Sequence, residues 1–401
     1  MRDFICLPRR SGARSAPEIA GDPKRSRYHG LTAAPRLCFA ILVVLGLAPV
    51  AAGCDDTSAP RTLAVFTAVS AGKEHTCGLT AAGAASCWGY NGYGELGDGP
   101  DTIRTSPVAV SGGVTFTAVS AGAWHTCGVT PAGAAYCWGY NLSGELGDGT
   151  DTSRLSPVAV SGGVTFAAVS AGGFHSCGVT HTGAVYCWGD GAFQPMAVGG
   201  GLTFAAVSAG GFHTCGVTPG GAAYCWGDNV YGQLGDGSDT SRPSPVAVGG
   251  GLTFVAVSAG GQHSCGVTPA GAAYCWGDNG YGELGDGSDT NRTSPVPVGG
   301  GLIFVAVSAG GSHSCALTAA GTAYCWGDNG YGQLGDGPDT NRTSLVPVRV
   351  SGGLTFASLK GGDEHTCGVT PADATYCWGR NVEGELGDGT TETIHVPTLV
   401  H

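Results

Sequence analysis

Residues 125–139 read His-Thr-Cys-Gly-Val-Thr-Pro-Ala-Gly-Ala-Ala-Tyr-Cys-Trp-Gly, and this stretch occurs in seven versions along the chain. Two short runs rich in β-branched and aromatic residues flank Pro131-Ala132-Gly133. Three connecting residues that end in glycine fit a three-residue β-hairpin, with Gly133 in the left-handed conformation of a bulged turn. The stretch therefore predicts an antiparallel hairpin that is used repeatedly.

The hairpin brings its two cysteines face to face. Counting outward from the turn sets Thr130 opposite Ala134 and Cys127 opposite Cys137. Directly opposed residues have Cα atoms roughly 4.5–5.5 Å apart, a separation that a disulfide can bridge. The same spacing predicts seven disulfides: Cys77–Cys87, Cys127–Cys137, Cys177–Cys187, Cys215–Cys225, Cys265–Cys275, Cys315–Cys325 and Cys367–Cys377. Of the 17 cysteines, Cys6, Cys38 and Cys54 are left over.

A metal site competes with the disulfide, because a histidine stands two residues before the first cysteine of each pair. His125, Cys127 and Cys137 should share one face of the hairpin. Structural zinc sites usually have more closely spaced cysteines, and seven identical metal sites would be unusual. We expect disulfides, no bound metal or cofactor, and a histidine that packs and forms hydrogen bonds. Metal ligation and free packed thiols remain the alternatives.

The repeat has a period of about 50 residues. The marker histidines are separated by 50, 50, 38, 50, 50 and 52 residues; they are His75, His125, His175, His213, His263, His313 and His365. Each full repeat has four short apolar segments, which in the second repeat are 106–110, 116–120 and the strands that contain Cys127 and Cys137. Pro107 suits an edge strand, so the first of these segments should be outermost. Four strands per repeat, seven times, predict a β-propeller with an all-β fold.

Two strings in each repeat resemble the regulator-of-chromosome-condensation repeat family. They are Val-Ser-Ala-Gly-x-x-His-[Ser/Thr] and Trp-Gly-x-Asn-x-x-Gly-[Glu/Gln]-Leu-Gly-Asp-Gly, found at 119–126 with 138–149 and at 257–264 with 276–287. The resemblance extends over about residues 62–400 and implies a seven-bladed propeller. The cysteine pair is an addition found in exported, bacterial-type versions of the family. Kelch repeats have a similar period, but their paired Gly, Tyr and Trp spacing is not met.

The two ends of the repeat region suggest how the ring closes. The region begins inside a repeat, at residues 62–70, and ends with a lone segment of the outermost type, residues 396–400. We expect this C-terminal strand to pair beside the N-terminal one and to close the ring, which would remove exposed sheet edges.

The N-terminus has the order of an export signal. Residues 1–36 contain eight Lys/Arg and three Asp/Glu, residues 37–50 are apolar, and Ala51-Ala52-Gly53-Cys54 follows. An apolar run of 14 residues is shorter than the span of about 20 that crosses a membrane. The end resembles the lipobox of bacterial lipoproteins, although Ala51 stands where that motif usually has Leu. We expect a signal at 1–54 with lipid attachment at Cys54, a tether at 55–61 and the propeller at 62–401; cleavage near Ala52 without lipid is the alternative.

Charge excludes one class of partner. Residues 1–54 carry a net charge of +5, so the rest of the chain carries −17 and contains ten Lys/Arg. Nucleic-acid binding requires a basic surface, and none is expected here. Disulfides fit an exported protein, because cytosolic thiols are kept reduced. We expect a cell-envelope protein, lipid-anchored or alternatively secreted, that is a monomer and contacts the membrane only through its anchor.

The polar motifs indicate structure rather than catalysis. Residues 144–152, Gly-Glu-Leu-Gly-Asp-Gly-Thr-Asp-Thr, recur in six repeats, and their carboxylates could bind Ca²⁺ or simply form turns. Arginines that follow these loops should pair with the aspartates; they are Arg104, Arg154, Arg242, Arg292 and Arg342. The polar residues repeat with the fold, whereas catalysis needs one asymmetric site, so we expect no enzyme. A eukaryotic relative with this repeat is a nucleotide-exchange factor for a nuclear small GTPase, but likeness of fold does not carry function.

The residues just before each histidine vary while their neighbours barely change. They lie on the turn between the second and third segments and should form a ring on one face of the propeller. Trp124, Phe174 and Phe212 fall on consecutive repeats and should form one aromatic patch, the kind of surface that anchors protein partners. The predicted partner-binding residues are Trp124, Phe174, Phe212, Gln262, Glu74 and Glu364. The alternatives are rings that plug the central channel, and a structural or glycan-binding envelope protein without a dedicated partner.

The third repeat lacks the long loop. Between Trp188 and Met196 it has only seven residues, Gly-Asp-Gly-Ala-Phe-Gln-Pro. One rim of the ring should therefore be lower there and form a notch; loop loss without consequence is the alternative.

Overall fold

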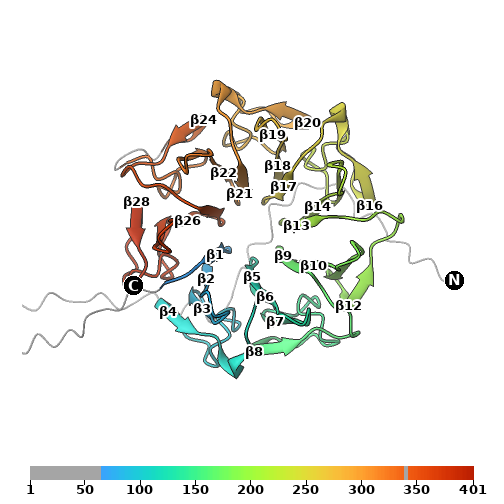
Figure 1. Ribbon diagram of the computed structural model, residues 1–401, viewed down its shortest axis with the longest axis vertical. Coiled ribbons are helices and arrows are strands. Elements are labelled where there is room, and N and C mark those ends of the chain that lie inside the picture. Colours follow the sequence, from blue (N-terminus) through green and yellow to red (C-terminus); the bar gives the residue numbers. More distant parts are fainter. Residues whose placement is uncertain (1–64, 338–341) are drawn as a thin grey trace, which may run out of the picture. The chain divides into compact units, whose positions relative to one another are not determined.

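The computed structural model describes residues 65–337 and 342–401, and these residues form seven four-stranded antiparallel sheets arranged as blades around a central axis (Figure 1). The chain is an all-β, seven-bladed propeller, as predicted. The expected signal at 1–54, including Cys54, and the tether at 55–61 lie outside the described residues. No helix in the described part of the chain is long and apolar enough to cross a membrane.

Each blade is one contiguous segment that runs from the axis outward. The strands nearest the axis are β1 (Ala68–Ala71), β5 (Ala118–Ala121), β9 (Ala168–Ala171), β13 (Ala206–Ala209), β17 (Ala256–Ala259), β21 (Ala306–Ala309) and β25 (Ser358–Gly361). The second strands are β2 (His75–Leu79), β6 (His125–Val129), β10 (His175–Val179), β14 (His213–Val217), β18 (His263–Val267), β22 (His313–Leu317) and β26 (His365–Val369).

The outer half of each blade completes the sheet. The third strands are β3 (Ala85–Gly89), β7 (Ala135–Gly139), β11 (Val185–Gly189), β15 (Ala223–Gly227), β19 (Ala273–Gly277), β23 (Ala323–Gly327) and β27 (Thr375–Gly379). The outermost strands are β4 (Arg104–Ala109), β8 (Arg154–Ala159), β12 (Ala192–Ala197), β16 (Arg242–Ala247), β20 (Arg292–Pro297), β24 (Ser344–Arg349) and β28 (Ile394–Leu399). Short 3₁₀ turns follow three of them: η2 (Ser111–Gly113), η3 (Gly249–Gly251) and η4 (Gly299–Gly301). The proline-containing segment is outermost, as expected.

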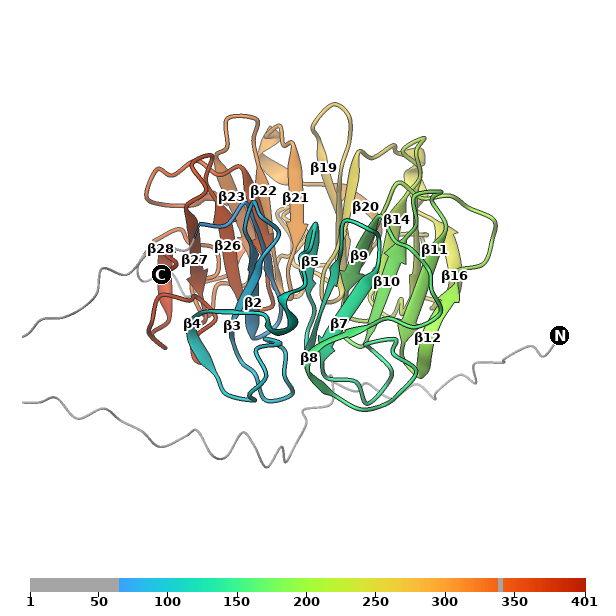
Figure 2. The ribbon, with the colours of Figure 1, turned by 60° about the horizontal axis from the view of Figure 1, so that its bottom comes forward.

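Consecutive strands in a blade are antiparallel, so two of the connections lie at the same end (Figure 2). The turn between first and second strands and the loop between third and outer strands share what we call the loop face. The turn between second and third strands lies on the opposite face. The residues before each histidine lie on the turn that joins the 116–120 type of segment to the histidine strand, as predicted; this is the turn between the first and second strands, because the axial strand is the first of its blade.

The hairpin is formed as predicted. Cys127 lies opposite Cys137, the Thr130 N–H donates to the Ala134 carbonyl, and Gly133 has a φ of 81°. All seven predicted disulfides are bonded, and the Cα atoms of Cys127 and Cys137 are 4.1 Å apart. Gly128 follows Cys127 because a Cβ there would lie 2.6 Å from the Phe116 ring, which packs across the strand.

The ring closes without a strand shared between the first and last blades, and one isolated β-bridge joins Val65 to Ala374 across this joint. β28 pairs only with β27 of its own blade, so the predicted pairing of the C-terminal strand with the N-terminal one is wrong. The outermost segment ends a blade, where the sequence had suggested that it begins one. The C-terminal segment still takes part in closure, because Val400 packs in one cluster with Phe66, Val69 and Trp88 of the first blade.

The third blade differs from the others. Asp190 and Gly191, with φ of 50° and 92°, form a two-residue turn that joins β11 directly to β12. Both residues have positive φ, as in the tight Asp-Gly hairpin turn. Cys187 in this blade is partly exposed, whereas the other thirteen paired cysteines are fully buried.

The oxidised protein should contain no free thiol among its fourteen paired cysteines, and graded reduction should open Cys177–Cys187 first, because only Cys187 is reached by solvent. Each bond closes a short loop and stabilises the fold by on the order of 2–3 kcal/mol in the chain-entropy model. Alkylation and peptide mapping after graded reduction measure the order. Alkylation of any of the fourteen before reduction, or opening of Cys127–Cys137 ahead of Cys177–Cys187, would contradict this prediction.

Candidate functional site

A ring of hydrogen bonds joins every blade to the next on the loop face. The Nε2 atom of each marker histidine lies 2.7–2.8 Å from the hydroxyl that follows the histidine of the next blade. The pairs are His75–Thr126, His125–Ser176, His175–Thr214, His213–Ser264, His263–Ser314, His313–Thr366 and His365–Thr76. The histidines are thus hydrogen-bonded packing residues, as expected, and they link the whole circle.

The protonation state of these histidines follows from their surroundings. The Thr126 hydroxyl donates to the Glu95 carbonyl, so it must accept from His75, and Nε2 carries the proton. Burial lowers the pKa of His125 to about 3, with a smaller contribution from the neighbouring His175 and His75. The pKa values of the other six fall to about 3 or 4 for the same reason. All seven imidazoles are neutral at physiological pH.

The long loops cover the joints between blades. In blade 2, the Glu145 carbonyl accepts from Trp188 Nε1 (2.9 Å) and Ser176 Oγ (3.1 Å), both in the next blade. Leu146 is fully buried against the Cys127–Cys137 disulfide and Trp188. Equivalent loops cover five other joints, through the carbonyls of Glu95, Gln233, Glu283, Gln333 and Glu385.

Within each loop the aspartate is used for structure. Asp148 accepts from Thr150 and forms an ion pair with Arg154 at 2.7 Å. Arg104, Arg242 and Arg292 pair in the same way with Asp98, Asp236 and Asp286, so four of the five predicted pairs are present. Asn141 also donates to Asp148 and accepts from the Leu146 N–H, which fixes the loop. These partners account for the recurring Asp-Gly motif as turn chemistry.

Two of the three predicted aromatic residues meet. The Phe174 and Phe212 rings lie on adjacent blades with centroids 5.5 Å apart, and Phe212 is 39% exposed. Trp124 lies instead against Tyr90 and Tyr93, with the Lys73 ammonium 4.5 Å from its ring. Within residues 65–337 and 342–401 no ring contact joins Trp124 to Phe174. The aromatic surface therefore consists of two groups.

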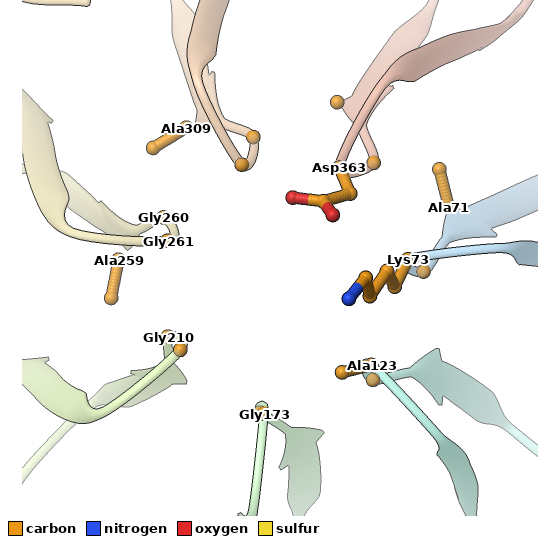
Figure 3. Close-up of a pocket in the computed structure, with 18 of the residues that line it drawn as sticks. Ala71, Lys73, Ala123, Gly173, Gly210, Ala259, Gly260, Gly261, Ala309 and Asp363 are labelled. Carbon is orange, nitrogen blue, oxygen red and sulfur yellow. The ribbon is translucent and has the colours of Figure 1, made fainter. Parts of the chain in front are cut away.

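None of these rings plugs the channel. The channel is lined by the Ala-Gly pair at the end of the first strand in six blades, by Gly361-Gly362 in the seventh, and by the residue after each pair, which is Lys73, Ala123, Gly173, Gly211, Gly261, Gly311 or Asp363. Figure 3 shows Lys73 and Asp363 extending into the opening, whereas the other blades present backbone and small side chains. The residues named for partner binding stand one position later, which turns them away from the channel lining.

The two predicted acidic residues meet at Arg380, a residue that the sequence reasoning missed. Arg380 forms ion pairs with Glu385, with Glu364 (3.3 Å) and with Glu74 (3.8 Å) across the joint between the last and first blades. Glu74 is 5% exposed, while the Glu364 side chain is 39% exposed. Only blade 7 has arginine directly after Trp-Gly, where the others have Tyr or Asp, and this difference was visible in the sequence. Gln262, the remaining predicted residue, is partly exposed on blade 5.

The joint between blades 3 and 4 has no covering loop, as the deletion in the third repeat predicted. Trp226 is 8% exposed, more than any of the six other blade tryptophans, and His175 and Cys187 are partly exposed beside it. The apolar cluster here contains Val179, Val185, Phe204 and Trp226, and it lacks the leucine that a loop supplies at the other joints. We call this gap the notch.

Family comparisons agree with the repeat. Two profiles of the regulator of chromosome condensation (RCC1) repeat match the chain, one at 66–95, 116–145, 166–194, 204–233, 254–283 and 304–333, the other at 83–129, 132–179, 220–267, 270–317, 320–369 and 373–401. Comparison with curated protein sequences gives no match.

Solved structures share the architecture at low identity. Human WBSCR16 is 22% identical with a TM-score of 0.72, over 78% of this chain and 94% of that one. Yeast RCC1 (Prp20), solved bound to Kap60, is 18% identical with a TM-score of 0.72, over 88% of this chain and 91% of that one. The CRINKLY ectodomain of the Arabidopsis thaliana receptor kinase ACR4 is 21% identical with a TM-score of 0.54, over 79% and 97%. These likenesses show the fold.

Stability should fall when the pH is lowered toward 3, because the buried histidines stay neutral in the fold but bind protons once unfolded. Their folded pKa values are lowered from 6.5 to about 3 or 4, so their contribution is complete above pH 6.5 and is lost as the pH falls through this window. Burial raises the pKa of Glu95 to about 8, and that of Glu283 and Glu385 to about 7, which opposes the trend down to about pH 4.5. The steepest loss of melting temperature should therefore lie below pH 4.5. Thermal unfolding between pH 7 and 3 tests this, and an unchanged melting temperature across that range would refute it.

Proposed function

The chain belongs to the family of regulator of chromosome condensation (RCC1) repeat proteins, whose propellers are protein-interaction folds, and we propose that it is an exported interaction module that presents its loop face to a protein partner. Seven disulfides support an oxidising location outside the cytosol. Prp20p from Saccharomyces cerevisiae has been described with its binding to Gsp1p and histones. The acidic exported part of this chain argues for a different partner, in the cell envelope or outside it.

The observation that carries the proposal is the pair formed by the exposed Phe212 and the partly exposed Phe174. It lies on the loop face, at positions where the blades differ while the rest of the repeat is nearly constant. The fold does not need these rings, because blades 5 and 6 have Gln262 and Ser312 at the same place. Exposed aromatic pairs of this kind provide the anchors of protein interfaces. Trp124, Gln262 and Glu364 would contribute to the edge of the contact, whereas Glu74 is held in the joint by Arg380.

Binding is favoured over catalysis by the use of the polar groups. The buried histidines, hydroxyls and loop aspartates each serve a structural contact that is repeated around the ring. A catalytic site requires a cluster that differs from its copies in chemistry. A structural or glycan-binding protein of the envelope is the alternative outcome of the experiment below.

Replacing Phe174 and Phe212 together by Ser should abolish capture of a stoichiometric partner from envelope extracts and leave the melting temperature nearly unchanged, because the rings contact each other at the surface. Ile303→Ser is the matched control. It removes a large side chain that is 60% exposed on the opposite face, and it should leave capture intact. Equal capture by wild type and the double variant would remove the aromatic pair from the site, and absence of any partner would favour the structural alternative.

Attachment through Cys54 completes the proposal. The small residues before Cys54 support processing as a lipoprotein, which would leave residues 55–61 as the tether. Cys54→Ala should move the protein from the membrane fraction to the soluble fraction and stop labelling by a palmitate analogue. A wild-type protein that is already soluble and unlabelled would instead support cleavage without lipid.

A further inference from the structure

The six covered joints show in detail what fits the notch. At each one, the loop of the preceding blade contributes a tripeptide of Glu or Gln, Leu and Gly, which we call the Leu-Gly turn. Between blades 2 and 3 this is Glu145-Leu146-Gly147. The glycine is required there, because a Cβ on Gly147 would lie 2.7 Å from Trp188 Cδ1.

The Leu-Gly turn is held by four backbone contacts. The Glu145 carbonyl accepts from Trp188 Nε1 and Ser176 Oγ, and the Gly147 carbonyl accepts from the Ser161 N–H (2.9 Å). Two residues later, the Gly149 N–H donates to the Phe193 carbonyl (2.9 Å). The leucine side chain fills the space between a disulfide and a tryptophan.

The notch presents the same groups without the turn. The equivalent residues at this joint are Trp226 for Trp188, Thr214 for Ser176, Gly199 for Ser161 and Pro243 for Phe193. In the described part of the chain, no acceptor lies on the Trp226 indole N–H or the Gly199 N–H, and no loop N–H reaches the Pro243 carbonyl. Thr214 is 99% buried and bonds His175, but it lacks the carbonyl to which its counterparts at the other joints donate.

Three of these groups can be reached by a ligand. Gly199 and Pro243 are exposed, and Trp226 is the most exposed of the seven blade tryptophans. The apolar side of the notch is formed by Phe204, Trp226 and the partly exposed Cys187. These groups correspond by repeat position to those that hold the Leu-Gly turn at the covered joints.

We propose that the notch binds a segment of the protein partner that contains [Gln/Glu]-Leu-Gly and adopts the conformation of this chain's own Leu-Gly turn. The carbonyl before leucine accepts from Trp226 and Thr214, the leucine packs on Cys187 and Phe204, and the glycine lies on the Trp226 ring. The glycine carbonyl accepts from Gly199, and the N–H two residues later donates to Pro243. The chain's own six copies of the turn are already engaged at their joints.

The position of the notch connects it with the proposed interface. Phe174 and Phe212 belong to the two blades that border it, and the Asp190 N–H donates to the Phe174 carbonyl. A segment seated in the notch would therefore begin beside the aromatic pair. This inference rests on the proposed function in one respect, namely that the partner is a protein, and it adds which element of the partner is recognised.

A blocked peptide with the sequence of residues 231–237, Tyr-Gly-Gln-Leu-Gly-Asp-Gly, tests the inference on the oxidised full-length protein. We expect saturable binding of one equivalent by calorimetry, slowed hydrogen exchange of the Trp226 indole N–H, and no binding of the same peptide with Asp in place of Leu. Trp226→Phe keeps the ring but removes the donor, so it should weaken binding about fivefold, as expected for one hydrogen bond of about 1 kcal/mol. Trp276→Phe, at a covered joint, is the matched control and should bind the peptide as wild type does.

A loop graft provides the second test. Replacing Asp190-Gly191 by residues 228–241 of blade 4 supplies the missing turn within the chain, so peptide binding should disappear and the melting temperature should rise. No peptide binding by wild type, undiminished binding by Trp226→Phe, or binding retained in a folded graft would each overturn the inference. The Phe174 and Phe212 variant separates the two proposals, because loss of partner capture with peptide binding intact places the failure at the aromatic pair alone.

Discussion

The hydrogen bond from a buried neutral histidine to a hydroxyl of the next blade is the interaction on which this ring depends. Each bond joins two sheets that share no strand pairing, and at six of the seven joints the same hydroxyl donates to a loop carbonyl. At these six joints the imidazole N–H and the hydroxyl are both satisfied, in an interior where an unpaired donor would be expensive. The arrangement also explains why histidine is required, since a neutral imidazole can donate from Nε2 while remaining uncharged at full burial.

The disulfides and the loops pack at the same joints between blades. Each disulfide lies in the middle of its blade, beside the hydroxyl of the next one, and each loop leucine covers it from the loop face. Small repeats of about 50 residues with short strands have limited apolar surface, so a covalent bond in every blade compensates for a thin core. The joint between blades 7 and 1 has the same contacts as the others, with Arg380 and its glutamates added. Closure therefore needs no shared strand.

The third blade lacks the loop that the other blades share, and the joint after it is the place where the ring can recognise a partner. At six joints the tryptophan N–H and the hydroxyl are bonded to a loop carbonyl, so these joints offer a partner little beyond loop surface. The joint beside Trp226 has the same groups without a covering loop, next to the two aromatic side chains that the fold does not require. In a ring of near-identical blades, the loss of one loop creates a site that differs from all the others. A ligand that resembles the lost loop can make the contacts that the loop makes elsewhere.

The sequence by itself determined the hairpin, the seven disulfides, the number of blades and the outermost position of the proline segment. These follow from the local spacing of residues, from the exclusion of Pro107 from central strands, and from the left-handed conformation that Gly133 can adopt. The sequence also located the missing loop, since a deletion is visible in a repeat. Tertiary structure alone decided which strand begins a blade, because the sequence period is the same for every choice of starting point. Tertiary structure also decided the partners of His125 and Glu74, which lie more than 50 residues away in the sequence. It likewise decided that Trp226 lacks the loop contact of the other blade tryptophans. Contacts across joints depend on how one rigid sheet sits against the next, and no local pattern records that placement.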